Sequence, residues 1–156
     1  MCDNEKKKIF FVCFANVCRS TMAQFIMRNI IRLKGLDDSI EIDSAGVFEE
    51  AVGMEIHEGT RRVLEDYGIP VENYKSKLLT KENYDEAYMI VCMDDKNIAA
   101  INEICDGDPE HKVRKLMSFA GRDEDVPDPW YTDDFDETYD AIIEGCRGLL
   151  DYLKQS

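Results

Sequence analysis

Residues 9–23 read IFFVCFANVCRSTMA, which joins a predicted strand to a predicted helix. A β-rich apolar run ends at Cys13, and a helical pattern of apolar residues begins after Arg19. In a turn between a strand and a helix, backbone N–H groups can point inward, and the first helical turn adds unpaired N–H groups and the positive end of the helix dipole. The stretch therefore predicts a cradle for a tetrahedral oxyanion.

Two side chains give this cradle its expected chemistry. Arg19 can hold two oxygens of one anion with its planar guanidinium, and the positive field favours the nucleophilic thiolate of Cys13. Ser20 is placed to donate a hydrogen bond to the sulfur, and Asn16 is the loop residue most tolerant of positive φ. A small hydrophobe buried at a strand end is the alternative interpretation of Cys13. The strand before it, the helix after it and the adjacent Arg-Ser pair favour the nucleophile.

Length and composition limit the possible functions. The 156 residues predict a single domain spanning 1–156. The net charge of −14, from 33 acidic and 19 basic residues, argues against nucleic acid and anionic membranes as partners. No apolar run approaches a membrane span, and no signal peptide is recognisable. The cysteines show neither CxxC spacing nor pairing with histidine, so we expect no metal and a reduced, cytoplasmic setting: Cys2, Cys13, Cys18, Cys92, Cys105 and Cys146.

Hydrophobic periodicity predicts alternating strands and helices. Helical patterns cover 19–34, 56–67, 95–105 and the C-terminal stretch from 132; strand patterns cover 9–13, 40–45, 87–94 and, most weakly, 112–117. This order predicts an α/β fold, a single three-layer domain in which helices cover both faces of a four-stranded parallel sheet of order 2-1-3-4. Ligands of such sheets bind beyond the carboxyl ends of the strands, where Cys13 lies.

The segment CFANVCRS at 13–20 resembles the signature loop of the low-molecular-weight protein tyrosine phosphatases, which usually reads C-x-G-N-I-C-R-S-P. The resemblance implies hydrolysis of aryl phosphates through a cysteinyl-phosphate, without a cofactor. Ala15 replaces the usual Gly, which is acceptable where φ is negative, and Thr21 replaces the usual Pro, at small cost in a first helical turn. The residues expected to bind phosphate are Phe14, Ala15, Asn16, Val17, Cys18, Arg19 and Ser20.

A second motif supplies the expected proton donor. Residues 125–131 read DVPDPWY and lie between the last strand and the last helix, and the family's general acid stands in such an Asp-Pro-aromatic-aromatic motif. The resemblance therefore assigns general acid and base to Asp128, although an exposed turn aspartate is the alternative reading from composition. Trp130, Tyr131 and Phe48 are expected to wall a slot for a flat ring.

The resemblance also implies supporting residues. Ser44, at the end of the second strand, would help to hold Asn16, although a serine in a turn is an equal alternative. Tyr67 stands where the family often has a histidine that braces the loop. Cys18 would form a reversible disulfide with Cys13, or be a small buried loop residue.

Three other functions are alternatives to a tyrosine phosphatase. The arginine-phosphatase branch of the family carries Thr at the position of Val17, so we favour phosphotyrosine proteins or peptides as substrates, with phosphate, sulfate or vanadate as site ligands. An arsenate reductase would need two more neighbouring cysteines, and Cys92 and Cys105 straddle a helix. A phosphoprotein-binding module without catalysis is the third alternative, and the intact set of Cys13, Arg19 and Asp128 argues against it.

Overall fold

A computed structural model describes residues 6–155, so Cys2 lies outside the described residues. Its centre is a four-stranded parallel sheet, in which neighbouring strands follow the order β2-β1-β3-β4. The strands are β1 (Lys7–Cys13), β2 (Ile40–Gly46), β3 (Met89–Cys92) and β4 (Val113–Lys115). This confirms the predicted sheet and its strand order.

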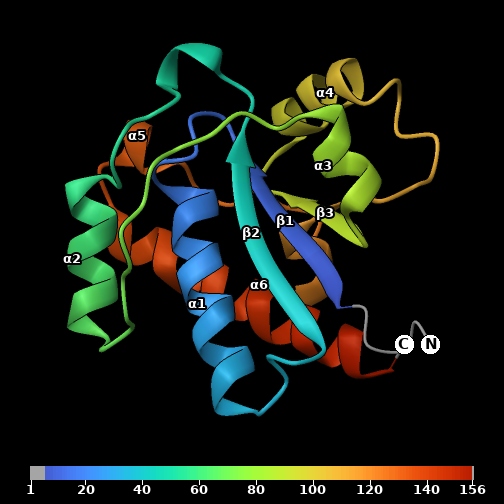
Figure 1. The fold of residues 1–156 in the computed structure, drawn as a ribbon. Helices are drawn as coiled ribbons and strands as arrows, with labels where there is room; N and C mark the ends of the chain where they lie inside the picture. Colours follow the sequence, from blue (N-terminus) through green and yellow to red (C-terminus); the bar gives the residue numbers. More distant parts are fainter. Residues whose placement is uncertain (1–5, 156) are drawn as a thin grey trace.

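Helices cover the sheet on both faces (Figure 1). They are α1 (Arg19–Leu33), α2 (Glu58–Asp66), α3 (Lys81–Glu86), α4 (Asp95–Ile104), α5 (Pro129–Thr132) and α6 (Phe135–Gln155), with 3-10 turns η2 (Glu49–Ala51) and η3 (Leu116–Ala120). None of the helices between residues 6 and 155 is long and apolar enough to cross a bilayer.

The side chains of β1 divide the core into two layers. Ile9, Phe11 and Cys13 belong to a large apolar cluster with residues of α1 and α6. Phe10 and Val12 point to the other face and join a smaller cluster with residues of α3 and α4. Because successive side chains of a strand alternate between faces, a strand in the middle of a sheet covered on both sides must be apolar throughout. The three-layer prediction is confirmed.

The observed ends of several helices and strands differ from the predicted ends by a few residues, for local reasons. The helix expected at 56–67 begins at Glu58 because His57 caps it, with Nδ1 accepting from the Gly59 N–H at 3.0 Å. The C-terminal helix begins at Phe135 rather than 132, since the separate turn of α5 ends in Asp133 with a left-handed φ of 56°. The strand predicted most weakly, at 112–117, is shorter in the structure because the chain turns into η3 at Leu116.

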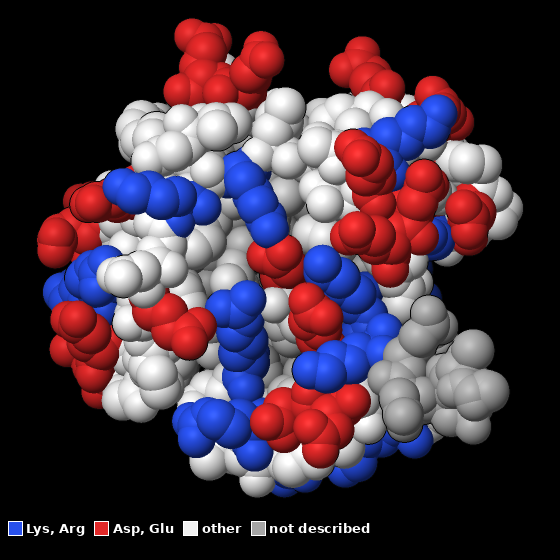
Figure 2. All heavy atoms as spheres, in the orientation of Figure 1, with Lys and Arg blue, Asp and Glu red and all other residues white. Residues whose placement is uncertain are grey.

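Charged side chains cover much of the surface visible in Figure 2. Figure 2 shows acidic and basic side chains interspersed across one face, with acidic ones projecting at the top of the view over the loop that contains η2 and over α4. Glu49 and Glu50 are the exposed acidic residues of that turn. This acidic turn lies within three residues of the carboxyl end of β2, at the edge of the sheet where the predicted oxyanion cradle lies.

Candidate active site

The loop from Phe14 to Cys18 joins β1 to α1 at the carboxyl edge of the sheet. Asn16 has a φ of 62°, as its tolerance of the left-handed region predicts, and Ala15 is not among the positive-φ residues, so its methyl group is accommodated. The loop closes onto β2 at Gly46, where a Cβ atom would lie 2.9 Å from the carbonyl oxygen of Phe14. Glycine is therefore required at 46 for the loop to pack this closely.

The sulfur of Cys13 ends a chain of buried hydrogen bonds. It lies 3.0 Å from the Ser20 hydroxyl, which accepts a hydrogen bond from Asn16 Nδ2 at 2.8 Å. The same amide nitrogen donates to Ser44 Oγ at 3.0 Å, and the Ser44 hydroxyl shares a further hydrogen bond with the side-chain amide of Gln24. The structure thus brings together the four predicted residues Cys13, Asn16, Ser20 and Ser44, and it adds Gln24.

The aromatic residue that braces this loop is Tyr74. Its hydroxyl donates to the carbonyl oxygen of Asn16 at 2.7 Å and lies 3.3 Å from Ser44 Oγ. Burial raises the pKa of Tyr74 to about 12, partly offset by hydrogen bonds to Ser44 and Thr21, so the hydroxyl keeps its proton and remains a donor. Tyr67, which stands where the family often has the bracing histidine, instead stacks on Tyr139 with ring centroids 4.0 Å apart.

Arg19, only 3% exposed, is held by groups from two other segments. Its Nη1 donates to Asp94 Oδ2 at 2.9 Å and to the Val126 carbonyl oxygen at 3.1 Å, and its Nη2 lies 3.4 Å from Asp128 Oδ2. Burial alone would lower the pKa of the guanidinium, but the charges of Cys13, Asp128 and Asp94 outweigh it and raise that pKa. Arg19 is therefore a fixed, permanently charged group beside the loop.

Asp128 caps the short helix α5. Its Oδ1 accepts from the N–H of Trp130 at 3.0 Å, and its Oδ2 faces Arg19. The segment before it is anchored, because the Val126 N–H donates to the Met93 carbonyl at 2.9 Å and Thr138 Oγ1 donates to the Pro127 carbonyl at 3.0 Å. The structure thus brings Asp128 to the same edge as the Cys13 loop.

The predicted ring-binding residues lie on two sides of this edge. Phe48 stacks on Phe14, with ring centroids 4.5 Å apart, and Phe48 and Val47 both donate backbone hydrogen bonds to the Phe14 carbonyl. Trp130 and Tyr131 follow Asp128 and are 72% and 81% exposed. Their rings therefore stand in solvent beside the site, available to a bound ring but packed against little of the protein.

Cys18 is buried within the loop. Burial, and next the charge of Cys13, raise the pKa of its thiol to about 12, so it stays protonated at neutral pH. Cys13, Cys18, Cys92, Cys105 and Cys146 are all free thiols. Val17 is also buried, and its carbonyl accepts from the His57 N–H at 3.0 Å.

The sequence did not predict that Asp94 contacts Arg19 or that Tyr74 braces the loop. Asp94 caps α4, since Oδ1 accepts from the Asn97 N–H at 2.8 Å, and its second oxygen also holds Arg19. Its place at the end of β3, the strand beside β1, was the available signal, because parallel strands bring their carboxyl ends to one edge. Within residues 6–155 no cluster of His, Cys, Asp and Glu is arranged to hold a metal ion.

Comparison with known proteins identifies the family of the chain. The model of the low molecular weight phosphotyrosine protein phosphatase family matches residues 8–156. The chain is 36% identical over 146 residues to the low molecular weight protein-tyrosine-phosphatase PtpA of Staphylococcus aureus, covering 93% of this chain and 92% of that protein. The crystal structure of YfkJ from Bacillus subtilis aligns with a TM-score of 0.94 at 32% identity, covering 98% of both chains. The structure of a mutant of the YwlE arginine phosphatase aligns with a TM-score of 0.84 at 28% identity, covering 96% of this chain and 97% of that one. The chain belongs to the low molecular weight phosphotyrosine protein phosphatase family.

Proposed function

We propose that this protein hydrolyses phosphotyrosine in proteins or peptides through a cysteinyl-phosphate, with Cys13 as nucleophile, Arg19 as phosphate clamp and Asp128 as general acid and base. The observation that supports it most directly is the position of Arg19. It lies within 3.4 Å of the Asp128 carboxylate and is one residue from Ser20, whose hydroxyl is 3.0 Å from the Cys13 sulfur. Nucleophile, cation and acid therefore meet at one edge of the sheet.

In the first step the Cys13 thiolate attacks phosphorus in line with the ester oxygen. A sulfur–phosphorus bond forms, the bond from phosphorus to the phenolic oxygen breaks, and protonated Asp128 gives its proton to that oxygen. Arg19 and the inward N–H groups of the loop hold the other three phosphoryl oxygens and stabilise the charge of the transition state. Tyrosine leaves as the neutral phenol.

In the second step water attacks the cysteinyl-phosphate. Asp128, now ionised, takes a proton from that water, the sulfur–phosphorus bond breaks, and inorganic phosphate and the Cys13 thiolate are released. The Ser20 hydroxyl, 3.0 Å from the sulfur, can donate to the departing thiolate. Acid and base are the same carboxylate in opposite protonation states, as microscopic reversibility requires.

The aromatic residues support a phenolic leaving group. A phosphotyrosine ring entering the site has the stacked pair of Phe14 and Phe48 on one side and Trp130 and Tyr131 on the other. Phosphoarginine is the second candidate, because the YwlE arginine phosphatase has a similar fold. It would present a charged guanidinium to Val17, whose side chain has no polar atom to meet it.

The test compares three phosphorylated substrates. We expect turnover of p-nitrophenyl phosphate and a phosphotyrosine peptide, much weaker turnover of phosphoarginine, and loss of all activity in Cys13→Ser. Cys105→Ser removes a thiol that is also buried, beyond the end of α4, and should keep the activity.

Three results would refute the proposal. Vanadate binding without any turnover would identify a phosphoprotein-binding module, thioredoxin-dependent arsenate reduction would identify a reductase, and faster hydrolysis of phosphoarginine would identify an arginine phosphatase.

A further inference from the structure

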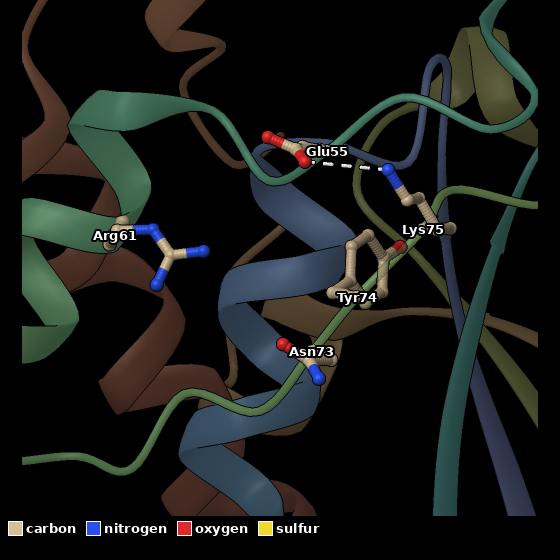
Figure 3. A pocket seen from close by; sticks show the side chains of 5 residues that line it. All are labelled: Glu55, Arg61, Asn73, Tyr74 and Lys75. Carbon is tan, nitrogen blue, oxygen red and sulfur yellow. Dashed lines mark hydrogen bonds and ion pairs between the residues drawn. The ribbon is translucent and has the colours of Figure 1, made fainter.

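A hollow lies beside the Cys13 loop. None of the residues that line it belongs to that loop. It has a volume of about 360 Å³ and is lined by Glu55, Arg61, Asn73, Tyr74 and Lys75. Figure 3 shows these side chains converging from the loop before α2, from α2 itself and from the extended segment that follows Pro70. We call this hollow the Arg61 groove.

Among the described residues, Arg61 has no anionic partner. Its guanidinium points across the groove toward Tyr74 (Figure 3), and it makes no hydrogen bond or ion pair with any residue of the described chain 6–155. The next residue differs, since Arg62 pairs with Asp66 at 3.2 Å and Asp136 at 3.7 Å. A guanidinium forms its strongest contacts with carboxylate or phosphate through two parallel N–H donors. Arg61 presents those donors to an open groove in a chain of net charge −14.

The other lining groups fit the same kind of ligand. Lys75 Nζ lies 3.4 Å from Glu55 Oε2 across the mouth of the groove, and the two side chains are 64% and 76% exposed. Such an exposed pair contributes about 1 kcal/mol or less, so an arriving anion can replace Glu55 as the partner of Lys75. Asn73 adds an amide donor, and the half-buried ring of Tyr74 adds a flat wall.

We propose that the Arg61 groove is a second anion-binding site, separate from the Cys13 loop, for a small aromatic phosphate or carboxylate. The acidic group binds Arg61 and Lys75, and the ring lies against Tyr74.

The groove is connected to the phosphate loop through one residue. The ring of Tyr74 forms its wall, and the hydroxyl of the same residue donates to the Asn16 carbonyl at 2.7 Å. Asn16 in turn donates to Ser20 at 2.8 Å, and Ser20 lies 3.0 Å from the Cys13 sulfur. A ligand that packs on Tyr74 therefore contacts the residue that braces the loop of the nucleophile.

The test uses ¹H–¹⁵N NMR of the full chain, with phenylphosphonate and benzoate as separate probes for the phosphate and carboxylate classes. With at least one probe, we expect the Arg61 Nε–H and the amides of residues 73–75 to shift along a saturation curve different from that of residues 14–20. Arg61→Gln should weaken the groove's affinity on the order of tenfold, because a charge-assisted pair of hydrogen bonds is lost. The curve of residues 14–20 should be unchanged.

Two further variants make the result specific. Arg62→Gln removes a neighbouring, already paired arginine and should leave the groove's curve unchanged. Lys75→Gln should weaken binding without altering α2, and it replaces Arg61→Gln if that variant does not fold.

The proposal is overturned if neither probe shifts the groove's signals at concentrations that saturate residues 14–20. It is also overturned if the shifts persist unchanged in Arg61→Gln and Lys75→Gln. Binding is measured without turnover, so this outcome is independent of the phosphatase assay.

Discussion

Arg19 of α1 is joined to Asp94 by a charge-assisted hydrogen bond of 2.9 Å that spans two neighbouring strand ends. The other oxygen of the same carboxylate accepts from the Asn97 N–H and caps α4. One side chain therefore fixes both Arg19, the proposed phosphate clamp, and the start of a helix on the opposite face of the sheet. The charge of Asp94 and its capping geometry can be separated by substitution.

We expect Asp94→Asn to lower kcat/KM for p-nitrophenyl phosphate on the order of tenfold, because the amide can still cap α4 but no longer offers a charge to Arg19. Steady-state kinetics and thermal unfolding measure the two effects. Asp95→Asn removes an exposed charge from the next position and serves as the control. Unchanged kinetics in Asp94→Asn, with only a lower melting temperature, would show that Asp94 acts only as a helix cap.

In the proposed mechanism Asp128 competes with the substrate for Arg19, since its carboxylate lies 3.4 Å from Nη2. We therefore expect Asp128→Asn to bind vanadate more tightly while its kcat on a phosphotyrosine peptide falls by roughly 10²- to 10⁴-fold, the range for loss of a general acid. Inhibition constants and kcat are the measurements. Asp125→Asn is the control, because Asp125 pairs with Lys115 instead.

The loss in Asp128→Asn should also depend on the leaving group. We expect the rate of cysteinyl-phosphate formation to fall less with p-nitrophenyl phosphate than with the phosphotyrosine peptide, because p-nitrophenolate leaves without a proton. Equal losses on both substrates would remove Asp128 from the acid role.

Tyr74→Phe should reduce kcat/KM several-fold and destabilise the fold by about 1 kcal/mol, because the ring stays but the hydrogen bond to Asn16 is lost. Kinetics and urea unfolding test this. Tyr67→Phe is a matched control, since Tyr67 stacks on Tyr139 and takes no part in the described network around Asn16. The bracing assignment fails if the two variants behave alike.

The raised pKa of Cys18, about 12, keeps this thiol neutral below that pH, and a neutral thiol is a poor nucleophile. Cys13→Ser removes the charge of Cys13 but keeps the burial of Cys18, which is the larger cause of the raised pKa. In this variant we therefore expect iodoacetamide to leave Cys18 unmodified between about pH 6 and pH 9, by peptide mass spectrometry. Protein unfolded in urea, where burial is removed, should be labelled at Cys18 and is the control. Rapid labelling of folded protein would show that the thiol is accessible and ionised, as a fast disulfide with Cys13 would need.

Exposed acidic residues border both sides of the site: Glu49 and Glu50 follow Phe48, and Asp133 and Asp134 follow α5. We expect phosphotyrosine peptides with flanking lysines to have a several-fold higher kcat/KM than those with flanking glutamates, and the ratio to shrink as salt screens the charges. Glu49→Gln combined with Glu50→Gln should narrow the ratio. Glu65→Gln combined with Glu103→Gln changes the net charge equally and should not.

The fold and the loop could be predicted because their signals are local. The apolar run of β1, the helix after Arg19 and the tolerance of Asn16 for positive φ are each written in a few consecutive residues. The supporting contacts could not be predicted in this way. Tyr74 and Asn16 are 58 positions apart, and Asp94 and Arg19 are 75 apart. Such pairs meet only because the crossovers between parallel strands return the chain repeatedly to one edge of the sheet.

The anchoring of the segment before Asp128 has a consequence for how turnover proceeds. Val126 is fixed through its N–H to Met93 and through its carbonyl to Arg19, and Pro127 is held by Thr138. In the proposed mechanism the proton donor, Asp128, is therefore in place before a substrate binds, whereas an enzyme whose acid lies on a mobile lid must close that lid in every cycle. The proposed cycle therefore needs no large rearrangement of the backbone between substrate binding and bond breaking.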